Sequence, residues 1–190
     1  MNSEDAEKTA GLRWYAVQTL KGREQRTVSD IADKVALGKE QVFIIENEME
    51  YKVKGVWHKE RKPFFPGYIF VATDITQAED FDRRLRKALG PLKLMNVDGT
   101  ITPIKSEEQD YLIQLGGEEH IIYHSEGFRI DDMVEITSGS FKGYKGEIRK
   151  LDRHNRHAKI CLQLMGQDIE VEIGLEIVRN TTFAELEAEE

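Results

Sequence analysis

The residues with the clearest chemistry in this sequence are the basic ones between Lys142 and Lys159. Seven basic side chains in this stretch stand against two acidic ones, Glu147 and Asp152. Guanidinium and ammonium groups bind phosphate, while histidine, asparagine and tyrosine side chains stack on unpaired bases or hydrogen-bond to them. The pattern predicts an RNA-binding turn with these candidate contacts: Lys142, Tyr144, Lys145, Arg149, Lys150, Arg153, His154, Asn155, Arg156, His157 and Lys159. A solvated hairpin loop without a ligand is the alternative interpretation.

The positive charge of this stretch is local. From Arg129 to Asn180 the chain has nine basic and nine acidic residues, and the formal net charge of the whole chain is -8. An indiscriminate nucleic-acid binder gains most of its affinity by neutralising phosphates, which an acidic protein does poorly. The composition therefore excludes that class and favours a contact confined to one basic turn.

A second candidate contact lies at Phe64-Phe65-Pro66-Gly67. Two large apolar rings stand beside a proline that cannot donate to a sheet ladder and a glycine that permits a sharp bend. We expect rings in such a place to be poorly covered and available to a protein partner. The alternative is that they belong to the core of a small domain.

Catalytic and metal-binding patterns are absent from the sequence. It contains no phosphate-binding loop, metalloprotease helix motif or nucleophile elbow. His154, His157 and the single cysteine, Cys161, are close together but lack the paired ligand cluster of a structural zinc site. We therefore expect no enzyme, no metal and no cofactor.

The first two thirds of the chain alternate between strand and helix patterns. Strands are predicted at 13–18, 42–45, 67–71 and 92–97, and helices at 21–37, after Thr76, and at 106–115. The pairs Thr76/Glu79 and Ser106/Gln109 have the spacing of capping boxes. The polar segment 46–62 reads as a protruding hairpin or flexible loop. This order predicts an α+β fold, a ferredoxin-like split βαβ domain with an antiparallel sheet and helices on one face.

The last third has no helical period. After a polar linker at 116–128, five short alternating runs predict strands at 133–136, 146–151, 158–164, 169–173 and 176–178. Five such strands in so short a stretch suggest a small closed β-barrel, with Gly139 and Gly146 in positive-φ conformation around a turn. The predicted domains are thus 12–115 and 129–180, between a disordered N-terminal tail (1–11) and an acidic C-terminal tail (181–190).

No apolar run approaches the roughly 20 residues that a membrane-spanning helix needs, and the N-terminal stretch has no apolar segment. One cysteine cannot form an intramolecular disulfide, which agrees with a reducing compartment. We therefore expect a cytoplasmic protein without a membrane partner, and a monomer.

Three segments in this order resemble the NusG family of transcription elongation factors. They are Trp14-Tyr15-Ala16-Val17-Gln18, the stretch from Arg61 through Phe64-Phe65-Pro66-Gly67-Tyr68, and the stretch from Val134 to Gly146, which looks like the KOW motif. The resemblance covers residues 12 to about 180. Where the family usually has a proline before the phenylalanine of the KOW turn, this chain has Ser140.

The resemblance implies that the N-terminal domain binds RNA polymerase. In NusG-like proteins an aromatic groove grips the clamp helices of the polymerase, a helix-in-groove contact. The corresponding candidates are Tyr15, Phe64, Phe65, Pro66 and Tyr68, while Trp14 and Phe70 are equally compatible with core and contact. The same domain lies near upstream and non-template DNA in the family, so basic helix residues become possible DNA contacts: Lys21, Arg23, Arg26, Arg83 and Arg84. A purely solubilising role for these charges is the alternative.

For the barrel, the resemblance implies binding of RNA or protein. Phe141 matches a tip residue that helps general members bind a termination factor or a small-subunit ribosomal protein. Specialised antiterminators of the LoaP type read a leader RNA hairpin, and the basic turn favours that specialisation here. The sequence thus predicts a non-enzymatic factor for processive elongation and antitermination. Its alternatives are a general NusG factor that couples polymerase to the ribosome or to termination, and a ribosome-associated KOW RNA-binding protein.

Overall fold

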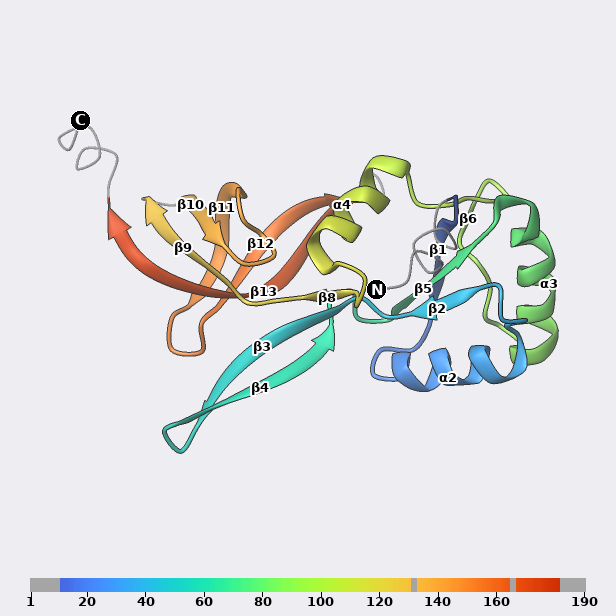
Figure 1. Cartoon of the computed structure of the whole chain (residues 1–190), viewed down its shortest axis with the longest axis horizontal. Helices are drawn as coiled ribbons and strands as arrows, with labels where there is room; N and C mark the ends of the chain where they lie inside the picture. The colour runs from blue at the N-terminus through green and yellow to red at the C-terminus, as the bar shows by residue number, and fades with distance from the viewer. Residues whose placement is uncertain (1–10, 131–132, 165–166, 182–190) are drawn as a thin grey trace. The chain divides into compact units, whose positions relative to one another are not determined.

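The computed structural model of the protein describes residues 11–130, 133–164 and 167–181 (Figure 1). Contacts divide the chain into two compact units. Unit 1 comprises the residues up to Ile44 together with Phe65–Asp110, and unit 2 comprises Ile45–Phe64 together with the residues from Tyr111 onward. The predicted α+β class is confirmed, with helices and sheets in unit 1 and a closed five-stranded barrel in unit 2.

Unit 1 is organised around a three-stranded antiparallel sheet in the order β1-β5-β2. Strand β5 (Tyr68–Thr73) lies between β1 (Arg13–Gln18) and β2 (Gln41–Phe43). Helices α2 (Glu24–Lys34) and α3 (Ala78–Leu89) supply the side chains that cover one face of it. Successive strand residues point to opposite faces, and the core therefore contains alternate residues of the strands packed against helical ones: Tyr15, Val17, Ile69 and Val71 with Ile31, Phe81 and Leu85.

The helices of unit 1 begin differently from the prediction. Thr76 is not the N-cap that the capping-box spacing suggests, because a short 3-10 turn, η1 (Ile75–Gln77), precedes α3 and is capped by Asp74. The Asp74 carboxylate accepts hydrogen bonds from both the backbone N–H and the hydroxyl of Thr76. An aspartate before the turn can satisfy its first free N–H groups directly, so the cap moves upstream.

The predicted strand at 92–97 is mostly irregular. Leu94 forms an isolated bridge to Val17, and only β6 (Asn96–Val97) pairs with β7 (Thr100–Ile101), around a tight turn at Asp98-Gly99. Helix α4 (Ser106–Gly116) follows. Its Gln109 does not close a capping box, since its side-chain amide accepts from Trp14 N–H and donates to the Leu12 carbonyl.

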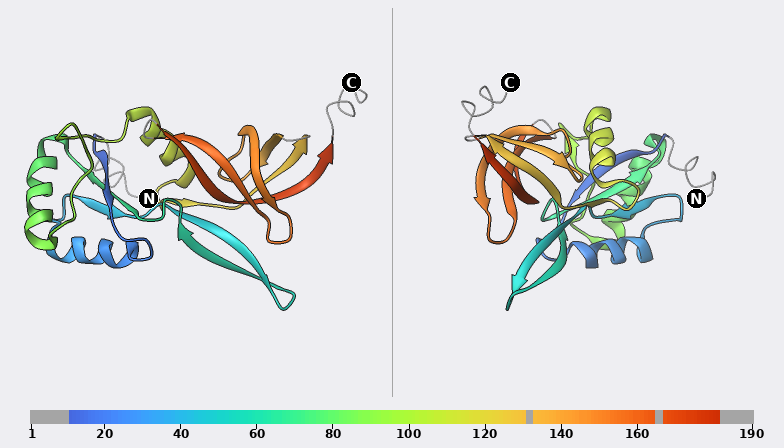
Figure 2. Two further views of the ribbon diagram at one scale, coloured as in Figure 1. Left: turned by 180° about the vertical axis from the view of Figure 1, so that it is seen from behind. Right: turned by 60° about the vertical axis from the view of Figure 1, so that its left-hand side comes forward.

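The barrel of unit 2, whose strands run from yellow to red in Figure 2, has the strand order β10-β11-β12-β13-β9. Its members are β9 (Ser125–Ile130), β10 (Met133–Ser138), β11 (Lys145–Asp152), β12 (His157–Leu164) and β13 (Gln167–Thr181). The prediction of two separate last strands was wrong. They form the single long strand β13, which pairs antiparallel with β12 and then parallel with β9, and the fifth strand is β9.

Gly174 explains part of this error, because it lies inside β13 where the pattern suggested a break. A Cβ there would meet the His124 ring at 2.8 Å and the Glu48 carbonyl at 2.9 Å, so this glycine provides space and does not end the strand. The start of β9 was missed because Ser125-Glu126-Gly127 contains no β-branched or aromatic residue. The range 116–128, predicted as a linker, therefore contains β8 (Ile121–Ile122) and the first four of the six residues of β9.

Unit 2 also contains the polar segment that was predicted as a hairpin or loop. It forms a long antiparallel hairpin of β3 (Glu46–Val53) and β4 (Val56–Pro63), and β3 pairs parallel with β8 on its other side. Contacts join β3 to the barrel strand β13, and the Asn47 amide donates to the Glu172 carbonyl. The hairpin is thus part of the same compact unit as the barrel.

Candidate functional site

An aromatic cluster lies on the face of the β1-β5-β2 sheet opposite the helices. The Trp14 and Phe43 rings meet edge to face at 4.8 Å between centroids, Phe43 stacks on Phe70 at 5.9 Å, and Phe65 meets Phe70 at 5.8 Å. These four residues are called the aromatic face below. Trp14, Phe65 and Phe70 are buried, and Phe43 is half-buried. Both faces of this small sheet are therefore apolar, one packed on helices and one aromatic.

A tight turn positions Phe65 at the start of β5. Tyr68 N–H donates to the Phe65 carbonyl at 3.0 Å, with Pro66 and Gly67 between them and Gly67 at φ 88°. Proline followed by a positive-φ glycine is the pattern of a type II turn. The turn is held at both polar groups of Gly67, whose carbonyl accepts from Thr19 N–H at 2.8 Å and whose N–H donates to Glu24 Oε1 at 2.7 Å.

Glu24 is buried in the first turn of α2 and holds this turn as an anion. Burial by itself raises the pKa of the Glu24 carboxyl, but hydrogen bonds from the backbone N–H groups of Glu24, Gly22 and Gly67 outweigh it. The result is a pKa below the usual range for glutamate. A carboxylate that accepts several N–H bonds is stabilised in its charged form, and the bend before β5 is therefore fixed to α2.

The residues predicted to bind polymerase do not all meet on the aromatic face. Phe65 lies there, and strand alternation places Tyr68 on the same side as Phe70. Tyr15 instead belongs to the helix-covered core. Phe64 belongs to unit 2, where it packs against Phe141 at 6.2 Å, while Pro66 is exposed. Sequence reasoning missed Phe43, although its position in a short apolar strand was a usable signal.

Most cations of the basic turn are paired with carboxylates. Lys145 contacts Glu135 at 2.9 Å, Arg149 contacts Glu147 at 3.5 Å, and Lys159 contacts Glu170 at 2.8 Å. Within the described residues Lys142 and Lys150 form no ion pair. The segregated positive charge of the sequence is therefore largely neutralised in three dimensions by acidic side chains of the same or neighbouring strands.

Two residues of the predicted RNA site hold the β3-β4 hairpin to the barrel. Arg156, at φ 55°, contacts Glu50 at 3.2 Å and Glu176 at 3.1 Å, and its guanidinium lies 4.2 Å from the centre of the Trp57 ring. The imidazole Nε2 of His157, 5% exposed, hydrogen-bonds with the carbonyl of Glu50 at 2.8 Å. These contacts give both residues a structural role inside unit 2.

Other residues of the predicted RNA site also have internal partners. Asn155 donates to Asp152 through its backbone N–H and its side-chain amide. Arg153 has a partner too. The Tyr144 hydroxyl donates to the carbonyl of Cys161 at 3.5 Å.

The glycines of this turn differ from the prediction. Gly139 has positive φ as predicted, but Gly146 is an ordinary strand residue, whose Cβ would collide with the Tyr144 ring. The second positive-φ glycine is Gly143. Ser140, the departure from the usual family pattern, uses its hydroxyl to accept Tyr123 N–H at 2.8 Å.

The basic residues of α2 and α3 are paired in a similar way. Arg84 contacts Glu40 at 2.6 Å and Asp80 at 3.0 Å, and Arg83 contacts Asp80 as well. Arg26 lies 3.9 Å from Asp30. Lys21 and Arg23 have no ion-pair partner in the part of the chain that the structure describes, and they keep the greatest freedom to contact phosphate.

The described residues contain neither a metal-ion site nor a membrane-spanning helix. No group of histidine, cysteine, aspartate and glutamate side chains there is arranged to hold a metal ion. No helix there has the length and apolar character to cross a membrane.

The N-terminal α+β part of the chain and the barrel with its Gly-Ser-Phe-Lys-Gly turn each match a family model. Residues 12–113 match the family described as transcription termination factor nusG, and residues 130–160 match the KOW motif. The chain belongs to the NusG family.

Curated relatives are similar over most of their length. The transcription termination/antitermination protein NusG of Thermus thermophilus is 23% identical over 85% of this chain and 95% of its own. That of Staphylococcus carnosus is 26% identical over 88% and 95%. A solved structure described as domain interaction in Thermotoga maritima NusG has a TM-score of 0.54 at 22% identity, covering 87% of this chain and 94% of its own, and supports the fold. Both curated relatives are described as transcription termination/antitermination proteins.

Proposed function

We propose that this chain binds RNA polymerase through its aromatic face and promotes processive elongation and antitermination, while the barrel contacts leader RNA. The single observation that carries the proposal is the cluster of Trp14, Phe43, Phe65 and Phe70 on the sheet face opposite α2 and α3. Apolar rings on a flat sheet face suit the apolar side of a helix pair, such as the polymerase clamp helices.

Rigid placement of Phe65 supports this role. The Glu24 and Thr19 hydrogen bonds fix the turn at Gly67, so little conformational freedom remains to be lost when a partner docks. Because the rings are buried, polymerase binding through them requires this face to become accessible. The proposed mechanism is closure of the polymerase clamp in a pause-resistant state, with the barrel adding a second, tethered contact that raises retention.

In the barrel, the cations that have no carboxylate partner among the described residues are the first candidates for RNA contacts. We place Lys142 and Lys150 first among the candidate RNA contacts, since paired cations have less charge to offer a phosphate. On the N-terminal domain, Lys21 and Arg23 are the corresponding candidates for upstream or non-template DNA. Phe141 is 2% exposed and packs between Phe64 and Tyr144, which gives less support to a ribosomal or termination-factor contact at this ring.

Pull-down with core RNA polymerase tests the polymerase contact. Phe65→Ser removes a central ring, and hot-spot aromatic residues contribute on the order of 2 kcal/mol or more, so we expect binding to weaken about 30-fold or more. Tyr123→Ser, a change of the same kind at a 41% exposed ring outside the face, is the matched control and should bind like the wild type. Failure of the wild-type protein to bind polymerase would refute the proposal.

In vitro transcription across a terminator tests antitermination. Read-through should rise with the wild-type protein when the transcript carries the leader RNA hairpin, and Phe65→Ser should abolish the increase. An increase in termination would instead identify a general NusG factor. Ribosome association without polymerase binding would favour the ribosome-associated alternative.

A further inference from the structure

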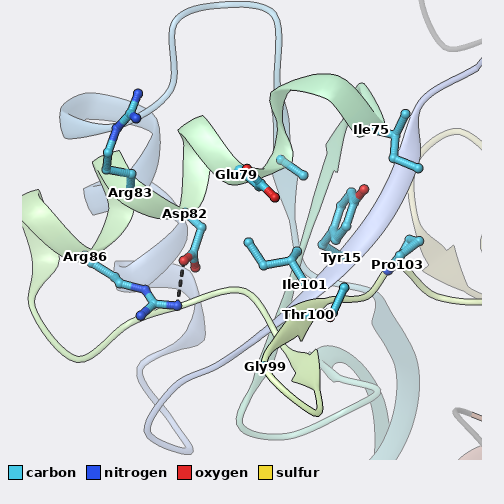
Figure 3. A pocket seen from close by; sticks show the side chains of 11 residues that line it. Tyr15, Ile75, Glu79, Asp82, Arg83, Arg86, Gly99, Thr100, Ile101 and Pro103 are labelled. Carbon is cyan, nitrogen blue, oxygen red and sulfur yellow. Dashed lines mark ion pairs between the residues drawn. The ribbon is translucent and has the colours of Figure 1, made fainter.

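A pocket of about 610 Å³ lies in unit 1, away from the aromatic face, between α3 and the β6-β7 hairpin (Figure 3). Its floor is Tyr15, which points to the opposite side of β1 from Trp14. Ile75, Ile101 and Pro103 contribute apolar walls. Polar side chains of α3 and the 99–100 turn complete the lining: Glu79, Asp82, Arg83, Arg86 and Thr100 with Gly99.

The hydroxyl of Tyr15 has no hydrogen-bond partner among the residues that the structure describes. Tyr15 is only 1% exposed, and Figure 3 shows its ring directed into the pocket. Burial raises the pKa of this phenol, so it stays a neutral group that can donate and accept. The pocket is open to solvent, so water can hydrogen-bond to this hydroxyl until a ligand displaces it. A ligand in the pocket can therefore reach the Tyr15 hydroxyl.

The charges around the pocket leave one carboxylate available. Asp82 is engaged, since Oδ1 accepts Leu94 N–H at 2.7 Å and Oδ2 contacts Arg86 at 2.7 Å. Arg83 is paired with Asp80, outside the pocket lining. Glu79 is exposed and has no ion pair within the described ranges, and it lines the pocket with Tyr15.

Two charged groups, Arg13 and Asp74, act on the Tyr15 phenol. The Arg13 guanidinium donates to the Ser106 hydroxyl and the Ile104 carbonyl, and both of these acceptors are neutral. The Asp74 carboxylate is close enough to act on the Tyr15 phenol in the opposite sense to Arg13. Their effects on the phenol therefore oppose each other, and Glu79 is the lining carboxylate that has no ion pair among the described residues.

We propose that this pocket receives an arginine side chain from a partner protein, with the guanidinium between the Glu79 carboxylate and the Tyr15 hydroxyl. A guanidinium has five N–H donors, so it can satisfy both acceptors at once. Its aliphatic stem matches the apolar walls at Ile75, Ile101 and Pro103. The site is separate from the polymerase contact, because Tyr15 and Trp14 lie on opposite faces of the sheet.

Methyl NMR of the full chain tests the proposal, with the Ile75 and Ile101 methyl groups as reporters. The probe is the capped tripeptide Ala-Arg-Ala, and capped Ala-Glu-Ala is its anionic counterpart. A single side chain should bind at millimolar strength. We expect both isoleucine methyl signals to shift with the arginine peptide and to remain in place with the glutamate peptide.

Variants assign the shifts to the two polar groups. Glu79→Gln keeps the size of the side chain and removes its charge, and it should weaken binding about fivefold or more. Tyr15→Phe removes only the hydroxyl and should weaken binding by roughly three- to tenfold, about the value of one hydrogen bond. Glu107→Gln, at an exposed carboxylate in the first turn of α4, is the matched control and should bind like the wild type.

Three results would overturn the proposal. The first is the absence of methyl shifts when the arginine peptide is at millimolar concentration and in 20-fold excess over the protein. The second is equal shifts with the glutamate peptide. The third is binding by Glu79→Gln that is as strong as that of the wild type. Methyl spectra of each free variant verify that it is folded, so a loss of binding cannot be confused with a loss of structure.

Discussion

In the aromatic face of unit 1, rings from separate parts of the chain pack together. In the basic turn of unit 2, charged side chains that are neighbours in the sequence pair with different carboxylates. Trp14, Phe43, Phe65 and Phe70 come from three strands and the turn before one of them. The antiparallel register places Ala16 opposite Phe70 and Gln18 opposite Tyr68, so side chains on one face become neighbours. Between 142 and 159, by contrast, adjacent cations turn to different acidic partners.

The difference follows from how each kind of side chain is stabilised. Aromatic rings are stabilised by burial away from water, so they pack together wherever strand alternation places them on one face. Cations repel one another, and a nearby carboxylate stabilises each of them more than a like-charged neighbour does. A basic run in a sequence therefore indicates a potential patch, and the pairing of each residue decides how much of it remains.

Trp14→Ala should have the largest effect on stability. It removes a 5%-exposed indole from the aromatic face, and such truncations cost about 3–5 kcal/mol. Thermal unfolding of the variant measures the loss in unit 1. Leu20→Ala, at a side chain that is 66% exposed, should stay within about 0.5 kcal/mol of the wild type. A loss below about 1 kcal/mol for Trp14→Ala would mean that the rings are not a packed cluster.

Arg156→Ala should destabilise unit 2 by about 1–3 kcal/mol, because it leaves Glu50 and Glu176 without their cation and removes the stack on Trp57. Chemical denaturation followed by Trp57 fluorescence in a Trp14→Phe background measures it. Lys159→Ala is the control, since its pair with Glu170 is exposed and should be worth less than about 1 kcal/mol. Equal effects of the two variants would mean that Arg156 has no structural role and remains a candidate RNA contact of the basic turn.

Mild acid should weaken unit 2 before unit 1. Burial lowers the pKa of His120 to about 4, from an ordinary value of 6.5. The unfolded chain therefore binds a proton that the folded one refuses, and stability falls as pH drops from 6.5 toward 4. Allowing for partial exposure, the loss is roughly 1–2 kcal/mol. His124, whose pKa burial also lowers, adds to it.

Unit 1 responds in a lower pH range. Its buried Glu24 has a lowered pKa, so the stability that this carboxylate provides is present above 4.5 and is lost below it. Unfolding curves between pH 6.5 and 4.5, read from Trp14 or Trp57 in single-tryptophan variants, separate the two units. His120→Asn, which tolerates the local φ of 57°, should reduce the acid sensitivity of unit 2, and simultaneous loss of both signals at pH 5.5 would contradict the expectation.

The smallest effect concerns RNA. The double substitution of Lys142 and Lys150 by alanine should lower the affinity for an RNA hairpin about three- to tenfold. The slope of log affinity against log salt concentration should fall by the equivalent of about two phosphate contacts, with the stability of the protein nearly unchanged. Filter binding at several salt concentrations measures both. The matched double change at Lys145 and Lys159, which have carboxylate partners, should have the smaller effect. The reverse order would show that ion pairing does not select the RNA contacts.

Local sequence determined the elements whose causes are local. The aromatic and β-branched residues from Arg13 to Gln18 predicted β1 with its observed bounds. Phe81 and Leu85 are four residues apart in the sequence, so α3 directs both of them into the core. Proline followed by glycine at 66–67 predicted the bend before β5, because φ preferences act within one or two residues. Family membership rested on such local motifs in order.

Only the tertiary structure decided the role of individual side chains. Phe64 and Phe65 are neighbours in sequence, yet one ring packs in the barrel unit and the other on the aromatic face. Arg156 contacts Glu50, which is 106 residues away in the sequence, and no local pattern predicts that pair. A contact between distant residues depends on strand order and register, which many residues set together. The sequence therefore predicted which side chains could bind, and the fold determined which of them remain free to do so.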